Sequence, residues 1–200
     1  MTGKGRRTLR KIAYYPSPAE ISKQLEASKG WPYRTEDPEL LDYYHKRDKA
    51  LLCLLYLLAV RVSEALRLTT DQFHLGVAKT TVYSILLSKS VRKDKLRNYQ
   101  YRQEAWLPRT GPRGKLTKIV EEYLALVPEK ERLFQFGTVR AWQIITALLD
   151  LPPHWFRAFG EDYLYRQWDH DLMAVANYIK VDARTLQQYI TSGYDKYKAV

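Results

Sequence analysis

The sequence has one cysteine, four histidines and no long apolar run, and each shortage excludes a class of protein. Cys53 lies inside an apolar segment, so the chain has neither a disulfide framework nor a thiolate metal cluster. The histidines show no metal-ligand spacing such as His-Glu-x-x-His. The run over residues 50–60 is shorter than the about 20 residues that cross a bilayer, and no apolar segment follows the basic N-terminus as a signal peptide requires. We therefore expect a soluble protein of the cell interior, with no metal and no cofactor.

Acidic residues are in the minority. The chain carries 33 Lys and Arg against 22 Asp and Glu, a net charge of +11 at pH 7. Residues 1–11 hold five basic residues and no acid, and residues 79–118 hold eleven basic residues and two acids. Positive charge concentrated beside a nearly neutral remainder is typical of proteins that bind a polyanion. A basic surface that serves only solubility is the alternative, and charge alone does not decide between the two. The sequence contains no basic amphipathic helix with bulky apolar anchors, so binding to an acidic membrane surface is not expected.

Hydrophobic periodicity predicts a mostly helical chain. Residues 1–16 form a basic N-terminal arm, and residues 17–200 form one domain, long enough to bury a core without disulfides or metals. Helical patterns cover residues 17–30, about 48–68, and most of the chain after residue 114.

Two segments in the middle of the chain have strand character instead. Residues 80–89 and 101–109 are rich in β-branched and aromatic side chains, and the basic stretch 90–100 joins them as a hairpin connection. The predicted fold class is therefore mainly α with a small antiparallel β-sheet (α+β).

The apolar segment ALLCLLYLLAVRVSEALRL, residues 50–68, contains two charged residues that a core helix should not carry. A buried arginine is costly unless an anion meets it. Glu64 follows Arg61 by three residues, so the pair can be a structural ion pair on one helix face. Alternatively, Glu64 holds Arg61 while the guanidinium grips a phosphate in a cleft. This segment alone leaves both interpretations open.

The C-terminal half adds further candidates. In LPPHWFRAFG, His154 and Arg157 lie three residues apart in the first turn of a helix that begins after a double proline. Free N–H groups at such a helix start favour anions. In NYIKVDARTLQQYI, Lys180 is followed nine residues later by Tyr189.

Together these segments resemble the signature boxes of the tyrosine recombinase (phage integrase) superfamily. Residues 47–73 look like its first box, PPHWFRA resembles its His-x-x-Arg box, and IKVDARTLQQY resembles its last box, which ends in the tyrosine nucleophile. The boxes occur in the family's order, with a basic hairpin between the first and the second, and the resemblance covers about residues 17–192. It implies the catalytic-domain fold of that superfamily, without the N-terminal core-binding domain that usually precedes it.

The resemblance also implies an activity: a site-specific recombinase (integrase) that cleaves and rejoins DNA through a 3′-phosphotyrosyl intermediate. Arg61 and Arg157 would clamp the non-bridging oxygens of the scissile phosphate, and Glu64 would orient Arg61. His154 would hydrogen-bond the phosphate and assist proton transfer. Tyr189 would attack phosphorus.

A lysine of the hairpin would protonate the departing 5′-oxygen. Lys89 is our choice for this general acid, with Lys93 and Lys95 as alternatives. Lys180 occupies the position where the family usually has His or Trp, and it would also contact the phosphate. Guanidinium groups suit the charge that spreads over the phosphoryl oxygens, and neighbouring cations favour the phenolate of the nucleophile, so the chemistry needs no metal.

The expected partner is double-stranded DNA, together with other protomers: a tetramer on two DNA sites that is monomeric when free. No membrane and no small-molecule substrate are expected, and the location would be cytoplasmic and DNA-associated, in a prokaryote or in the host cell of a virus. Basic side chains of the arm and the hairpin are expected to contact DNA: Lys4, Arg6, Arg7, Arg92, Lys93, Lys95 and Arg97.

Three departures from the family pattern leave alternatives open. Ala59 replaces the usual glycine two residues before the first arginine, which we expect to be tolerated if the backbone there is helical. Ala158 stands where a histidine often follows the second arginine, and Ile179-Lys180 replaces the usual pair of the last box. The alternatives are a non-catalytic DNA-binding protein of the same fold, a type IB topoisomerase-like relaxing enzyme, and an unrelated basic helical protein that binds nucleic acid.

Overall fold

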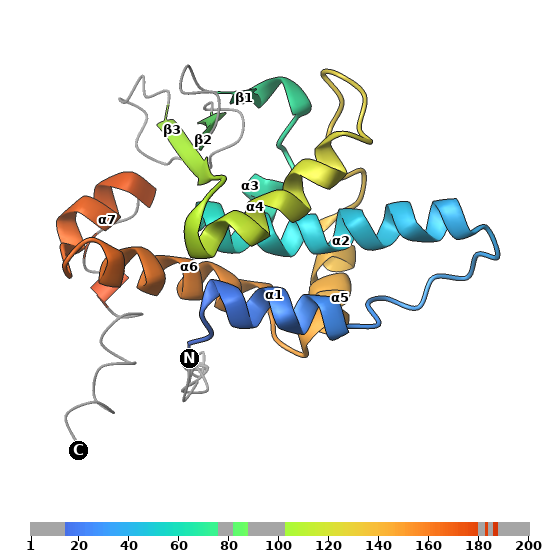
Figure 1. The fold of residues 1–200 in the computed structure, drawn as a ribbon, viewed down its shortest axis with the longest axis horizontal. Coiled ribbons are helices and arrows are strands. Elements are labelled where there is room, and N and C mark those ends of the chain that lie inside the picture. Colours follow the sequence, from blue (N-terminus) through green and yellow to red (C-terminus); the bar gives the residue numbers. More distant parts are fainter. Residues whose placement is uncertain (1–14, 76–81, 88–102, 180–182, 184–185, 188–200) are drawn as a thin grey trace, which may run out of the picture.

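The structure, a computed structural model, describes residues 15–75, 82–87, 103–179, 183 and 186–187. Helix α2 (Pro38–Leu58) runs through the middle of the molecule, and other helices pack around it (Figure 1). Its N-cap residue Asp37 accepts hydrogen bonds from the backbone N–H groups of Glu39 and Leu40. From Ala50 to Leu58 every residue of α2 is buried, so this half forms the centre of the core.

The remaining helices cover α2 from several sides, with α4 and α6 making its most extensive contacts. Short helices α3 and η1 follow α2 directly. The helices are α1 (Pro18–Ala27), α3 (Val62–Ala65), η1 (Thr70–Gln72), α4 (Gly111–Leu124), α5 (Thr138–Leu149), α6 (Pro153–Gln167) and α7 (Leu172–Ile179). None of the helices in the described ranges is both long enough and apolar enough to cross a membrane.

Three antiparallel strands form one sheet in the order β1-β2-β3. They are β1 (Phe73–Leu75), β2 (Val82–Leu87) and β3 (Gln103–Pro108). Ile85 of β2 pairs with Ala105 of β3, and both are buried against the helical core. The predicted mainly α fold with a small antiparallel sheet is therefore confirmed, with β1 as one strand more than the sequence predicted.

The helix predicted over residues 48–68 is wrong at both ends. Asp37 and Pro38 start α2 ten residues earlier, because together they form a cap and a first helical position. At its other end Ala59 adopts a left-handed conformation, with φ 49° and ψ 34°, so α2 stops and α3 begins after Arg61. The expectation of a helical backbone at Ala59 is thus also wrong. Arg113 of α4 donates from Nη2 to the carbonyl oxygen of Leu57 and satisfies one of the orphan acceptors at this helix end.

A glycine sets the distance between α2 and α6. A Cβ atom added to Gly160 would lie 2.0 Å from the carbonyl oxygen of Tyr56, so only glycine allows the two backbones to approach this closely. Because α6 begins with the His154 segment and α2 ends just before Arg61, this approach brings the two predicted boxes together.

A second, smaller apolar cluster connects the end of α2 to the C-terminal segment. The methyl group of Ala59 is fully buried in it, and its other members come from α6, α7 and the chain beyond α7. They are Leu164, Val175, Ala176, Ile179 and Leu186. The turn that precedes Arg61 is therefore packed against the segment that leads to Tyr189.

Candidate functional site

Arg61 lies in the turn between α2 and α3, which resolves the apparent conflict between a charged pair and an apolar segment. Because the chain leaves the helix at Ala59, the Arg61 side chain reaches the surface and is 50% exposed, whereas that of Glu64 is 1% exposed. Oε2 of Glu64 accepts the backbone N–H of Arg61 at 2.7 Å, and Oε1 accepts Nη1 of the same residue at 3.0 Å. Glu64 therefore fixes both the backbone and the guanidinium of Arg61.

His154 and Arg157 lie in the first turns of α6, which begins at Pro153 as the double proline predicts. Nε of Arg157 donates to Oε1 of Glu161 at 2.7 Å, one helical turn further on. The side chain of Arg157 is 16% exposed and that of Glu161 is 3% exposed, so this ion pair is largely removed from water.

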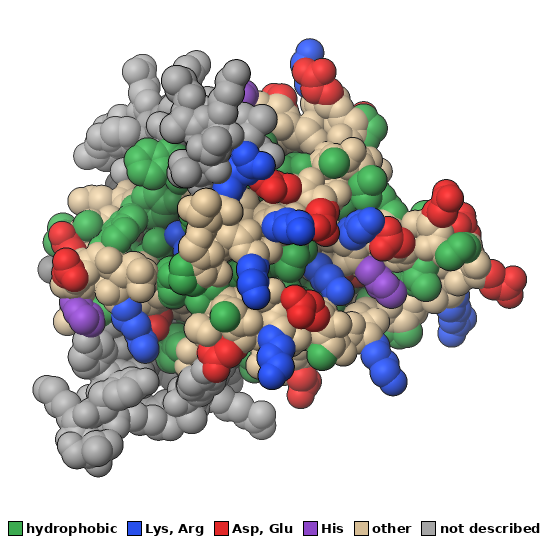
Figure 2. Space-filling model, viewed as in Figure 1, with side chains coloured by type: hydrophobic (Ala, Val, Ile, Leu, Met, Phe, Trp, Pro, Cys, Tyr) green, Lys and Arg blue, Asp and Glu red, His purple; other side chains and the backbone are tan. Residues whose placement is uncertain are grey.

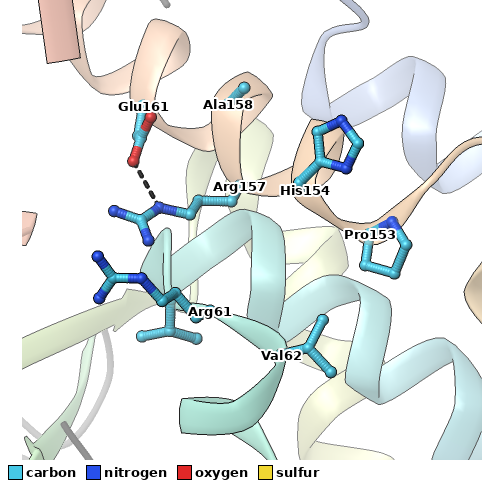
Figure 3. A pocket seen from close by; sticks show the side chains of 8 residues that line it. Arg61, Val62, Pro153, His154, Arg157, Ala158 and Glu161 are labelled. Atoms are coloured by element: carbon cyan, nitrogen blue, oxygen red, sulfur yellow. Dashed lines mark hydrogen bonds and ion pairs between the residues drawn. The ribbon is translucent and has the colours of Figure 1, made fainter. Parts of the chain in front are cut away.

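One pocket of about 300 Å³ brings these residues together. Figure 3 shows the guanidinium groups of Arg61 and Arg157 extending to the same side of the pocket, one beside the other, with Arg157 joined to Glu161. His154 lies one turn before Arg157 on the same helix. The pocket is lined by Val60, Arg61, Val62, Pro153, His154, Arg157, Ala158 and Glu161.

Burial shifts the ionisation of two groups at this pocket. Partial desolvation lowers the pKa of His154, which is still exposed at the surface, below its ordinary value of 6.5, and this favours the neutral ring with one lone pair and one N–H. Burial raises the pKa of Glu161, while the charge of Arg157, its hydrogen bond and the charge of Arg61 act in the opposite direction. The influence of Arg61 on Glu161 agrees with the two guanidiniums lying in one pocket.

The pocket has the composition of an anion site that is neutral before the anion arrives. Two arginines are each held by one buried glutamate, so the four charges cancel. Within the described part of the chain, the side chains of Arg61 and Arg157 have no further hydrogen-bond acceptor. Their remaining N–H groups are available to an oxyanion, and a tetrahedral phosphate matches two planar guanidinium forks well.

Glu161 was not among the site residues predicted from the sequence. The signal was present, because a glutamate four residues after an arginine on a predicted helix lies on the same face. We also assigned no role to Arg113, which fixes the end of α2 just ahead of Arg61.

The structure brings together Arg61, Glu64, His154 and Arg157, and it does not describe the other predicted site residues. The nucleophile, the lysine candidates and the DNA-contacting residues lie outside the described residues and stay predictions: Tyr189, Lys89, Lys180, Lys4, Arg6, Arg7, Arg92, Lys93, Lys95 and Arg97. Over the ranges that are described, no group of three or more His, Cys, Asp or Glu could hold a metal ion.

Comparison with known proteins finds similar solved structures but no match by sequence. No family model matches the sequence, and no curated protein matches it. Two crystal structures of the XerH site-specific recombinase are similar, one bound to difH substrate in a pre-cleavage complex and one bound to palindromic difH substrate in a post-cleavage complex. Both give a TM-score of 0.62. The fold is that of a tyrosine recombinase.

The match covers nearly all of this chain at low sequence identity. The pre-cleavage complex is 19% identical over 96% of this chain and 55% of the XerH chain. The post-cleavage complex is 16% identical over 89% of this chain and 48% of the XerH chain. This chain therefore spans about half the length of the recombinase chains it resembles. The predicted tyrosine recombinase fold is confirmed by this similarity.

Proposed function

We propose that this chain is the catalytic part of a tyrosine-type site-specific recombinase that cleaves and rejoins duplex DNA. One observation carries the proposal: on a recombinase fold, Arg61, Arg157 and His154 line one pocket. The two guanidinium groups lie side by side (Figure 3), with N–H groups that no residue in the described ranges accepts. Arg61 lies more than 90 positions before His154 and Arg157 in the chain, yet all three line one pocket. Its two guanidiniums suit a phosphodiester.

In the proposed reaction, the phenolic oxygen of Tyr189 attacks the scissile phosphorus, and the bond to the 5′-oxygen breaks. Arg61 and Arg157 bind the two non-bridging oxygens and stabilise the charge that these oxygens carry in the transition state. Neutral His154 accepts the phenolic proton of Tyr189 as the new bond to phosphorus forms. Lys89, or one of its hairpin neighbours, gives the departing 5′-oxygen its proton.

The product is a 3′-phosphotyrosyl DNA with a free 5′-hydroxyl group. The aryl phosphate ester conserves the energy of the broken bond, so a 5′-hydroxyl can attack it in reverse and rejoin the strand without ATP. Since one tyrosine per protomer cuts one strand, exchange between two duplexes requires four protomers. Double-stranded DNA and further copies of the chain are thus the proposed partners.

A second candidate function is DNA binding by the same fold without cleavage. Ala158 favours it, because this residue lines the pocket and its methyl group has no hydrogen-bonding atom to offer a phosphate. The position next to the second arginine therefore contributes nothing polar to the site.

Covalent trapping separates the two functions. The protein is incubated with a pool of nicked suicide duplexes of randomised sequence, in which a cut strand cannot be rejoined, and adducts are sought on a denaturing gel. A recombinase gives an SDS-resistant protein–DNA species, and sequencing of the trapped duplexes reveals its preferred site. A binding protein gives only a complex that weakens steeply with salt. Relaxation of supercoiled plasmid by monomers, without strand exchange, would instead identify a topoisomerase-like enzyme.

A further inference from the structure

We infer that Glu161 is a positioning residue for the reaction, which fixes Arg157 so that the edge of its guanidinium formed by the two Nη groups faces the phosphate. The inference rests on the proposed function, since it assigns Glu161 to the same phosphate pocket. It names a residue that the sequence pattern did not single out.

The contact involves one specific nitrogen of Arg157. Oε1 of Glu161 accepts the N–H of Nε at 2.7 Å, and no other acceptor for this side chain occurs among the residues the structure describes. A guanidinium has five N–H donors in a rigid plane, so a bond at Nε sets the direction of the four at Nη1 and Nη2. In Figure 3 these two nitrogens extend beyond the Glu161 contact, on the side where the guanidinium of Arg61 lies.

Glu64 holds the first arginine in a complementary way. Its Oε1 accepts one N–H of Nη1 of Arg61, so Nε, Nη2 and the second N–H of Nη1 have no acceptor among the residues that the structure describes. Each arginine is thus fixed by a buried carboxylate at one nitrogen and offers its remaining donors to the pocket. Because both guanidiniums are held in place before the substrate arrives, less entropy is lost on reaching the transition state.

The charge of Glu161 has a cost for DNA binding. An ionised carboxylate at the wall of a phosphate pocket repels the incoming anion, so a residue selected only for DNA affinity would be neutral or basic there. Removing this charge should therefore leave binding as strong or make it stronger, while the rate of the chemical step falls. A substitution that slows the chemical step without weakening DNA binding is characteristic of a positioning residue.

The alternative is an ion pair that only stabilises the helix, and α6 contains a matched example of one. Asp162 is also buried and pairs with Arg166 at 2.9 Å, again with a spacing of four residues. This pair does not line the pocket. Asp162→Asn is therefore the control for Glu161→Gln, because it removes the same kind of charge from the neighbouring position.

The experiment measures three quantities in the wild type, Glu161→Gln and Asp162→Asn. These are the rate of adduct formation on the suicide duplexes, the Kd for the same duplexes, and the NMR signal of the Arg157 Nε–H with and without inorganic phosphate. Loss of the signal in Arg157→Lys assigns it. Glu161→Gln should form adduct about 10- to 100-fold more slowly with an unchanged or lower Kd, and Asp162→Asn should behave as wild type.

Each outcome bears on the inference. A Glu161→Gln variant that cleaves at the wild-type rate overturns it, and so does a parallel loss of binding and rate in both variants. If Glu161→Gln does not fold, Glu161→Asp replaces it, because its shorter carboxylate keeps the charge but loses the reach to Nε. If the wild type forms no adduct, the proposed function fails, and the NMR signal decides about Glu161. If phosphate shifts the Arg157 Nε–H signal in the wild type but not in Glu161→Gln, the positioning role is supported. Equal shifts in the two proteins overturn it.

Discussion

Glu64 binds Arg61 with both of its carboxylate oxygens, one on the backbone N–H at 2.7 Å and one on Nη1 at 3.0 Å. The glutamate is buried and the arginine is half exposed, so the pair lies across the boundary between core and surface. The glutamate thus connects the apolar interior to a cation that faces solvent. This arrangement explains how a charged pair is tolerated in an apolar segment.

Glu64→Ala should therefore destabilise the protein and slow cleavage together. The substitution removes two hydrogen bonds to a charged acceptor and leaves a polar backbone group unsatisfied, which costs about 1–3 kcal/mol. Urea unfolding measures this loss. Glu121→Ala removes the pair with Arg109, in which the glutamate is 23% exposed against 1% for Glu64, and should cost less than about 1 kcal/mol. Equal losses in the two variants would contradict the role given to Glu64.

Ala59→Gly should leave stability almost unchanged, because two effects oppose each other. Glycine relieves the left-handed backbone at φ 49°, which costs a non-glycine residue about 1 kcal/mol. It also removes a buried methyl group, which contributes about 0.8 kcal/mol. Ala176→Gly removes a methyl from the same cluster in a regular helix and should cost about 1.5–2 kcal/mol. A loss at position 59 as large as that at 176 would show that the backbone there carries no strain.

The pKa of His154 should rise when a phosphate enters the pocket. Burial lowers this pKa in the free protein, so protonation is disfavoured until the pH falls below 6.5. A phosphate dianion or a DNA phosphate beside the ring favours the imidazolium, which moves the pKa upward. An NMR titration of the His154 ring with and without duplex DNA measures the change. Arg61→Ala, which weakens the anion site, should reduce it. A pKa that DNA leaves unchanged would place the phosphate elsewhere.

Stability should respond to the ionisation of Glu161. Burial raises the pKa of this carboxyl above its ordinary value of 4.5, so the unfolded chain ionises at a lower pH than the folded one. The wild type therefore loses stability as the pH rises through the raised pKa, and Glu161→Gln, which cannot ionise, does not share this loss. As the pH rises above 4.5 and through the raised pKa, the free energy of unfolding of the variant should increase relative to wild type. Asp162→Asn should act in the same direction, since burial raises the pKa of Asp162 too. A change of opposite sign would contradict the desolvation of Glu161.

The resemblance to the recombinase boxes predicted that Arg61, His154 and Arg157 belong to one site, and all three line one pocket, while their roles in the reaction stay predictions. The sequence pattern also predicted two strands of the small sheet, since residues 80–89 contain several β-branched side chains and residues 101–109 contain two aromatic ones. These features are local in the chain, or depend on a motif, and could be inferred without coordinates.

The break at Ala59 could not be inferred in this way. Alanine favours helix, and nothing in the sequence indicates that its methyl group is buried against Leu164 and Val175 when the backbone turns. Tertiary packing decides this conformation. The second carboxylate, Glu161, was missed for another reason: its spacing from Arg157 was visible, but such pairs are common on helix surfaces, and only the burial of both side chains distinguishes this one.

The most direct test of the proposed chemistry identifies the residue that carries DNA. Adducts trapped on the suicide duplexes are digested with nuclease and trypsin, and mass spectrometry locates the nucleotide on the peptide. We predict a 3′-phosphotyrosyl nucleotide on Tyr189, absent in Tyr189→Phe and strongly reduced in Arg157→Ala. A nucleotide on any other tyrosine, or salt-sensitive binding with no adduct under any condition, would contradict the account.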